Sequence, residues 1–257
     1  MGFLLLIGIL ILSLLSFYYN QYNEINLKNT LIPIFSKDNI LGTDQFGRDV
    51  FSRISKATYI SIVIGTISNL IASIIGVLFG TIAGFYKKLD LIIMRIIEIM
   101  QSFPTLLILI AMISIFTPSI QLTIFIIGIV SWPSIARVVR AQVLLVKSRE
   151  YIIAATAMGY PQNRIILYHV LLNCLSPIII IFTLGVSNSI MFESGLSFLG
   201  LGVQPPDPSL GRMINEGKDF IITSPELFIL PSMVLSTIII SFNLLGEGLR
   251  EALEVKK

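Results

Sequence analysis

The stretch EYIIAATAMGYPQNRIILYHVLLN, residues Glu150–Asn173, is a long soluble-looking segment between two strongly apolar runs of the chain. Its first part, as far as Met158, is compatible with a helix. Gly159 follows the last periodic residue, where a left-handed residue ends a helix. Pro161 suits the first turn of a second helix, because the N–H that it lacks would be unpaired there.

The second helix of this stretch is predicted to have one polar and one apolar face, since Arg164 and His169 alternate with aliphatic residues at helical spacing. Ala154 and Ala155 in the first helix are small enough for another protein to approach closely. The pattern therefore predicts a helix–turn–helix segment that lies outside the bilayer and is held by a partner. An ordinary amphipathic hairpin at the membrane surface is the alternative.

Composition indicates a membrane protein. Hydrophobic residues make up 54% of the 257-residue chain, charged residues only 13%, and the mean hydropathy is +0.88, whereas soluble domains contain about 25% charged residues. With one cysteine the chain cannot form an internal disulfide or a cysteine-cluster metal site. We expect no metal site and no binding of nucleic acid.

Six apolar runs are long enough to be membrane spans of about 20 residues. We therefore predict an all-α fold, a single transmembrane domain over residues 1–257 with a cytoplasmic loop over 140–176, and spans near residues 2–19, 59–86, 91–116, 120–139, 177–201 and 227–245. The first run has no basic segment before it and no small-residue cleavage site after it, so we interpret it as an uncleaved span. Gly76, Gly80 and Gly84 recur every four residues, which predicts close helix packing.

The charge pattern favours an orientation with both termini in the cytoplasm. Six spans place both ends on one side, and that side then holds about eleven basic residues against seven on the other. The first outer loop is the part that fits least well, because five of those seven residues lie in it.

The Glu150–Asn173 stretch resembles the EAA loop of binding-protein-dependent ABC importer permeases, whose pattern is roughly E-A-A-x-x-x-G, ten residues, then I-L-P. Ala154, Ala155 and Gly159 match this pattern. Two positions depart from it, because Ile153 replaces the glutamate and Leu172 replaces the proline. Glu150, three residues before Ile153, supplies an acid on the same helix face.

Four further segments resemble the oligopeptide, dipeptide and nickel branch of these permeases. They follow one another in the expected order over nearly the whole chain: LGTDQFGRDVFSRI (41–54), MRIIEIMQSFP (94–104), ESGLSFLGLGVQPPDPSLG (193–211) and FNLLGEGLREALE (242–254). The resemblance implies a type I ABC importer permease fold with six transmembrane helices. It also implies a multi-pass protein of the bacterial cytoplasmic membrane.

The same resemblance implies the activity and the partners. The chain would be the transmembrane subunit of an ATP-driven importer for peptides, or for nickel or metal chelates. It would work with a second homologous permease, two cytoplasmic ABC ATPases, an extracytoplasmic substrate-binding protein and membrane lipid. ATP and Mg would be bound by the ATPases, because this chain has no phosphate-binding loop and would not itself be an enzyme.

The expected residues of the ATPase-coupling loop are Glu150, Ala154, Ala155, Gly159, Pro161, Arg164 and His169. Within the spans, ionisable side chains are costly and suggest function, so Glu193 and Glu98 are candidates for the pathway or gate, with Ser194 and Ser197 beside the former. Glu193 has no basic partner nearby in sequence, which predicts that it faces a water-filled cavity, a distant basic group or another subunit. For Glu98 the alternative is a structural pair with Arg95, one helical turn away.

Two polar outer segments contain the candidates for docking of a binding protein, namely Asp44, Arg48, Asp49, Asp207 and Arg212. For the first segment a structural interpretation is equally open, since its acids and arginines could tie the loop together by ion pairs and turn hydrogen bonds.

Two other classes of protein are alternatives to the importer subunit. A self-sufficient proton-coupled secondary transporter would more often show duplicated halves or interrupted helices, and Glu193 would then be its proton site. An intramembrane enzyme would need a nucleophile and a base, and the chain offers one histidine and one cysteine.

Overall fold

The computed structural model describes residues 2–18, 22–36 and 39–254 of the chain. In these ranges every regular element is a helix, apart from one isolated bridge between Thr43 and Asp49. The helices in chain order are α1 (Gly2–Tyr18), α2 (Val50–Phe85), α3 (Lys87–Gln101), α4 (Thr105–Ile113), α5 (Ile120–Lys147), α6 (Glu150–Ala157), α7 (Gln162–Arg164), the π-helix η1 (Ile165–Leu171), α8 (Leu175–Phe198), α9 (Leu210–Gly217), the 3-10 helix η2 (Lys218–Phe220) and α10 (Glu226–Glu254).

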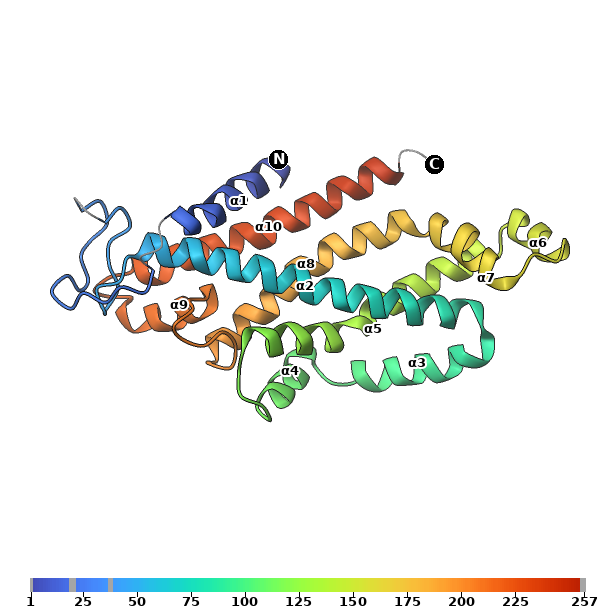
Figure 1. Ribbon diagram of the computed structural model, residues 1–257, viewed down its shortest axis with the longest axis horizontal. Helices are drawn as coiled ribbons and strands as arrows, with labels where there is room; N and C mark the ends of the chain where they lie inside the picture. The colour runs from blue at the N-terminus through green and yellow to red at the C-terminus, as the bar shows by residue number, and fades with distance from the viewer. Residues whose placement is uncertain (1, 19–21, 37–38, 255–257) are drawn as a thin grey trace.

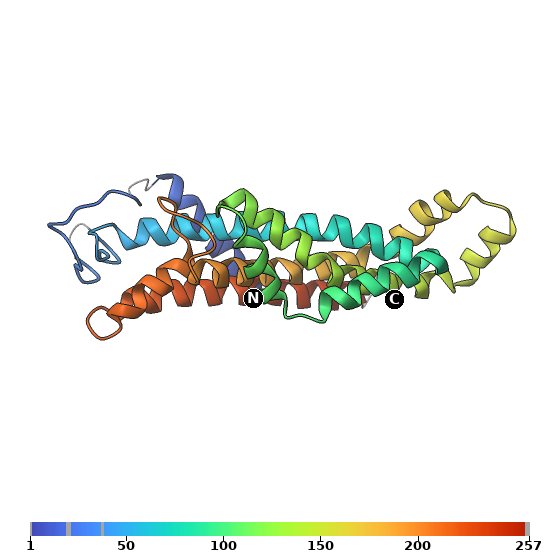
Figure 2. The ribbon, with the colours of Figure 1, turned by 90° about the horizontal axis from the view of Figure 1, so that it is seen from below.

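The molecule is an elongated bundle in which α2, α5, α8 and α10 run along the long axis (Figures 1 and 2). At one end α6, α7 and η1 project beyond the bundle, and at the other end lie the loop before α2 and helix α9. We call these the inner and the outer end. The all-α prediction is confirmed.

Four helices in the described ranges are long and apolar enough to cross a membrane, namely α2, α5, α8 and α10. Helices α3 and α4 pass the same test only together, and they are bent by 82° at their break, so they count as a fifth span if the pair is one. Helix α1 is apolar but shorter. The predicted total of six spans is reached when both the bent pair and α1 are included.

The helix boundaries differ from the predicted spans at several places, and α10, for example, extends to Glu254 instead of ending near residue 245. Helix α2 begins at Val50 rather than near residue 59, because the Asp49 side chain accepts a hydrogen bond from the Ser52 N–H at 2.7 Å and caps the helix. The predicted span 91–116 breaks before Pro104, since proline disfavours a helical residue in front of it. Helix α5 continues through residue 147, well beyond the predicted end at residue 139.

Close packing of α2 against α5 is made possible by the three glycines at four-residue spacing. A Cβ added to Gly76 would lie 2.7 Å from the Ile135 side chain, and one added to Gly80 would lie 2.6 Å from the Ala136 carbonyl oxygen. Any side chain here would force the two backbones apart. The predicted role of the glycines is confirmed.

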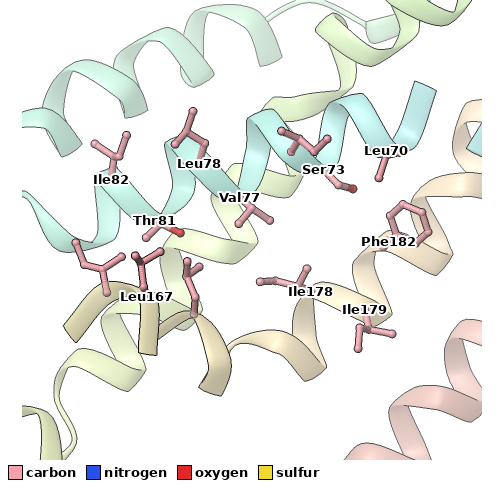
Figure 3. A pocket seen from close by; sticks show the side chains of 13 residues that line it. Leu70, Ser73, Val77, Leu78, Thr81, Ile82, Leu167, Ile178, Ile179 and Phe182 are labelled. Carbon is pink, nitrogen blue, oxygen red and sulfur yellow. The ribbon is translucent and has the colours of Figure 1, made fainter. Parts of the chain in front are cut away.

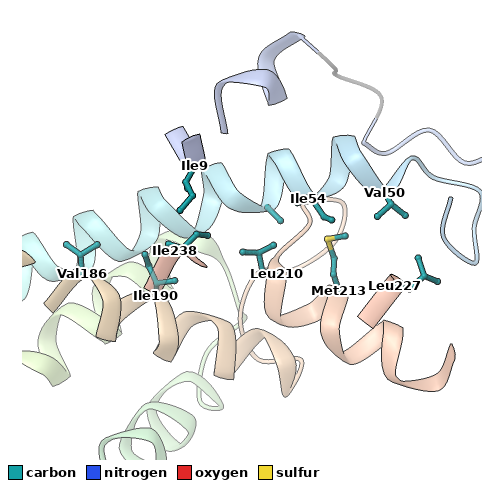
Figure 4. Close-up of a cluster of buried hydrophobic side chains, with 10 residues drawn as sticks. Ile9, Val50, Ile54, Val186, Ile190, Leu210, Met213, Leu227 and Ile238 are labelled. Atoms are coloured by element: carbon teal, nitrogen blue, oxygen red, sulfur yellow. The ribbon is translucent and has the colours of Figure 1, made fainter. Parts of the chain in front are cut away.

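The outer half of the bundle has its own hydrophobic core, to which α1, α2, α8, α9 and α10 contribute (Figure 4). Ile54 and Val50 of α2 and Ile190 of α8 are at most 1% exposed. Figure 4 shows Leu210 and Met213 of α9 reaching into the same cluster. This core holds the outer loops against the spans.

Candidate coupling surface and translocation cleft

The turn between α6 and α7 forms as the glycine and proline pattern predicts. Gly159 has φ +78°, the left-handed conformation that glycine adopts without strain. The Gly159 N–H donates to the Thr156 carbonyl at 3.0 Å and the Tyr160 N–H to the Ala155 carbonyl at 3.2 Å, which is the hydrogen-bond pattern of a Schellman motif. Pro161 lies at the N-cap of α7, one residue before the first turn where we expected it.

A small core anchors this inner loop on the bundle. Ile152 of α6 and Ile165 and Val170 of η1 are at most 2% exposed and pack with Val143 of α5. Ala155 is also buried, so of the two alanines in the motif only Ala154 faces outward. The second element of the loop is mostly a π-helix, where the sequence predicted an ordinary helix.

The outward surface of the loop is apolar and aromatic. Tyr151, Ile153, Met158 and Tyr168 are between 46% and 69% exposed. Helix α6, which carries the first two, projects beyond the end of the bundle (Figure 1). Glu150 is exposed beside them at the start of α6. An exposed apolar patch rimmed by polar residues is typical of a protein–protein contact.

Tyr160 links two further predicted coupling residues. The Arg164 guanidinium lies 5.0 Å from the centre of the Tyr160 ring, and the His169 ring centre lies 6.5 Å from it. The side chains of Arg164 and His169 therefore gather at the turn, as part of one surface.

A second site is a polar cleft of about 440 Å³ between α2, the α3–α4 break, α5 and α8. Its polar lining consists of amide and hydroxyl side chains without a charged residue: Asn69, Gln101, Thr105, Ser131, Ser134, Asn188 and Ser189. The Asn69 amide donates to the Phe182 carbonyl at 2.7 Å, and the Gln101 amide lies 3.4 Å from the Ser134 hydroxyl. The sequence analysis missed these residues, although amides inside apolar runs are a usable signal.

Glu193 is fully buried and lies near the outer end of α8. Its carboxyl accepts hydrogen bonds from Ser61 of α2 at 2.9 Å, from Ser197 at 2.7 Å and from Ser194 at 3.3 Å. The prediction that Glu193 faces a cavity, a basic group or another subunit is wrong for this conformation, because neighbouring serines satisfy it. The Ser197 hydroxyl also accepts from the Val203 N–H at 3.1 Å, which ties the turn after α8 to the same cluster.

Glu98 forms the structural pair that the sequence suggested. Its carboxylate lies 3.2 Å from the Arg95 guanidinium, and both side chains are more than half exposed. It does not line the polar cleft.

The outer charged candidates form one network between the loop before α2 and helix α9. Asp44 accepts from the Arg48 Nε at 2.7 Å and also pairs with Arg53. Glu216 lies 2.8 Å from the Arg212 Nε, and it is within 3.6 Å of the guanidinium groups of Arg48 and Arg53. The structural interpretation of the first segment thus accounts for Asp44 and Arg48. Arg212 joins the same network through Glu216, which sequence reasoning missed.

The two remaining outer candidates behave differently from each other. Asp49 caps α2 and accepts from the Asn39 amide at 2.9 Å, so its carboxylate is used inside the loop. Asp207 is half-buried in the proline-rich segment. A docking role of these outer residues stays a prediction.

Long apolar helices around a polar cleft, with a folded loop beyond one end, are the architecture of a polytopic membrane protein. The family described as binding-protein-dependent transport system inner membrane component matches residues 76–256, more than half of the chain. The chain belongs to this family, as its motifs suggested.

Relatives and solved structures agree with this assignment. The chain is 39% identical over 238 residues to the dipeptide transport system permease protein DppC of Alkalihalophilus pseudofirmus, covering 92% of this chain and 78% of the relative. It is 40% identical to the glutathione transport system permease protein GsiD of Pectobacterium atrosepticum, covering 84% and 72%. The fold resembles a chain of the inward-facing MetNI methionine ABC transporter, with a TM-score of 0.66 at 17% identity, covering 77% of this chain and 94% of that one.

Proposed function

We propose that this chain is one of two permease subunits of an ATP-driven importer for peptides, with the polar cleft forming its half of the translocation pathway. The observation that carries the proposal is the cleft itself, which places uncharged donors and acceptors between four membrane helices. Amides and hydroxyls can exchange hydrogen bonds with a peptide backbone whatever its side chains are.

Peptides fit this lining better than nickel or a metal chelate does. Nickel prefers imidazole and other nitrogen or sulfur ligands, and the cleft contains neither histidine nor cysteine nor a carboxylate. In the described part of the chain no three histidine, cysteine or acidic side chains come together as a metal site. The names of the dipeptide and glutathione permeases point the same way.

The inner loop is the proposed contact with two cytoplasmic ATPases, which bind ATP and Mg and perform the hydrolysis. ATP-driven closure of the ATPases would move α6 and η1, and with them the inner ends of α5 and α8. The permease pair would then change from inward-open to outward-open, biased by the differential affinity of the two states for the closed ATPases. In this proposal both termini of the chain lie in the cytoplasm, and an extracytoplasmic binding protein docks at the outer end.

Affinity purification of the tagged chain in mild detergent from its native membrane, followed by mass spectrometry, tests the proposed composition. We expect a second permease and two ATPases to copurify. Site-directed cross-linking then locates the contact, because the native Cys174 is buried. Ile153→Cys should cross-link to an ATPase, whereas Ile222→Cys, an exposed position near the opposite end, should not.

Two results would contradict the proposal. A chain that purifies alone and transports substrate in vesicles would be a self-sufficient transporter. Cross-links to an ATPase from Ile222→Cys, and none from Ile153→Cys, would place the coupling surface at the wrong end.

A further inference from the structure

An apolar groove of about 660 Å³ lies on the side of the bundle, between α2 on one wall and η1 and α8 on the other (Figure 3). On α2 the wall extends from Leu70 to Ile82, and Leu167, Ile178 and Phe182 are among the residues opposite. Its only polar side chains are Ser73 and Thr81, whose hydroxyl oxygens are buried. The surface that the groove presents is therefore hydrocarbon.

The length of the groove matches one leaflet of a bilayer. Twelve residues separate Leu70 from Ile82, which corresponds to about 18 Å along a helix. The hydrocarbon core of a membrane is about 30 Å thick, so one leaflet contributes about 15 Å. Since Ile82 is only three residues from the end of α2 at Phe85, the groove lies along the inner part of α2.

An extended hydrocarbon chain fits the shape and the lining of this groove, because the walls are apolar over a length of about 18 Å.

Basic side chains lie at the inner end of the groove. The Lys147 ammonium donates to the Phe85 carbonyl at 2.7 Å, one helical turn beyond the lining residue Thr81. Arg164 lies directly before η1, which forms the opposite wall. Both side chains are exposed, and neither forms an ion pair within the described ranges. Asp90 is paired with Arg140 at 2.5 Å.

We propose that this groove binds an acyl chain of an anionic glycerophospholipid, with the phosphate of the headgroup between Lys147 and Arg164. The chain would fill the groove along the inner part of α2, in contact with both α2 and η1. The lipid would thereby become part of the contact between the coupling loop and the spans. The proposal concerns binding and is independent of which substrate the cleft carries.

Native mass spectrometry of the permease complex, combined with lipid analysis, tests this proposal. The complex is purified in mild detergent from membranes that contain both anionic and zwitterionic phospholipids. We expect retained phospholipid that is enriched in the anionic class. Val77→Trp and Ile178→Trp place an indole in the groove from opposite walls and should each remove most of the retained lipid. Ile240→Trp, at a half-exposed position of α10 that lines no cavity described above, is the matched control and should retain it.

The headgroup contact is tested by Lys147→Gln and Arg164→Gln. Each should lower the ratio of retained anionic to zwitterionic lipid about fivefold, since a basic residue near the membrane surface attracts anionic lipid by about 1 kcal/mol. The proposal is overturned if the wild-type complex retains no phospholipid, if both tryptophan variants retain it like the control, or if the neutral variants leave the ratio unchanged. A disulfide from Val77→Cys to a helix of the second permease would also overturn it.

Discussion

The Glu193 carboxyl links helices α2 and α8 through hydrogen bonds. It is the common acceptor for serines on α2 and α8, and Ser197 passes the connection on to the backbone at Val203. Removing the acceptor leaves buried hydroxyls without a partner, whereas an amide of the same shape keeps one.

We therefore predict that Glu193→Ala lowers the free energy of unfolding by about 1–3 kcal/mol, and that Glu193→Gln lowers it by much less. Thermal denaturation in detergent, followed by size-exclusion chromatography, measures the difference. If the glutamine variant were as unstable as the alanine variant, the negative charge rather than the hydrogen bonds would be what the site requires.

Gly159 is the residue on which the shape of the coupling loop depends. A Cβ at this position would meet no atom within 4 Å, so the requirement is conformational rather than steric. Gly159→Val should cost about 1–2 kcal/mol locally and lower the substrate transported per ATP hydrolysed in reconstituted vesicles. Gly159→Asn is the control, because asparagine tolerates a left-handed conformation, and it should couple nearly as well. Equal coupling by the valine variant would remove this turn from the mechanism.

Among the elements, the pair α2 and α5 depends most on small side chains. Gly80→Ala places a Cβ 2.6 Å from the Ala136 carbonyl oxygen and 2.8 Å from the Val139 Cβ, so the two helices must separate. Gly248→Ala in α10 is the matched control, because a Cβ there meets nothing within 4 Å.

We expect the overpacking in Gly80→Ala to lower the free energy of unfolding by about 1–3 kcal/mol. The melting temperature of the detergent-solubilised protein should fall accordingly. Gly248→Ala should leave the melting temperature unchanged or raise it slightly, since alanine favours a helix by about 1 kcal/mol over glycine. Equal melting temperatures for the two variants would mean that the helix contact can relax at little cost.

Sequence periodicity predicts elements of this kind well when apolar runs and glycines repeat, as they do in α2. It fails where one local hydrogen bond decides, as at Asp49, which starts α2 in a segment that is too polar for a span. Pro104 indicates the break between α3 and α4, but hydropathy alone predicts one continuous span across it.

At the scale of the whole molecule, the outer end is closed by charge pairs between segments far apart in sequence. Glu216 of α9 faces arginines at positions 48, 53 and 212. We predict that Glu216→Gln destabilises the protein by about 1.5–3 kcal/mol, the range for hydrogen bonds to charged groups. Urea denaturation measures this loss, and Glu98→Gln, which removes an exposed pair, should change stability by less than about 1 kcal/mol. Equal losses for both variants would argue against the network.

Of the candidate sites, the sequence could predict the one that lies in a single segment better than those assembled from several helices. The coupling loop is one contiguous segment, so its turn and most of its candidate residues could be predicted from neighbouring residues in the sequence. The polar cleft is assembled from four separate segments, and the partners of Glu193 include Ser61, which is 132 positions away. No pattern along the chain specifies such a juxtaposition before the helices are packed.

Helix α2 has a mechanical consequence. Its 36 residues span about 54 Å without an internal proline, so it extends well beyond the hydrocarbon of the membrane at about 30 Å. The ion pairs of Arg53 fix the outer end of α2 in the charge network, and the inner end of α2 lies beside the coupling loop (Figure 1). If the ATPases bind the coupling loop as proposed, a tilt that they impose on α2 at one membrane surface would displace its other end at the opposite surface. The proposed docking face for an external partner would therefore respond, through α2, to the state of the ATPases.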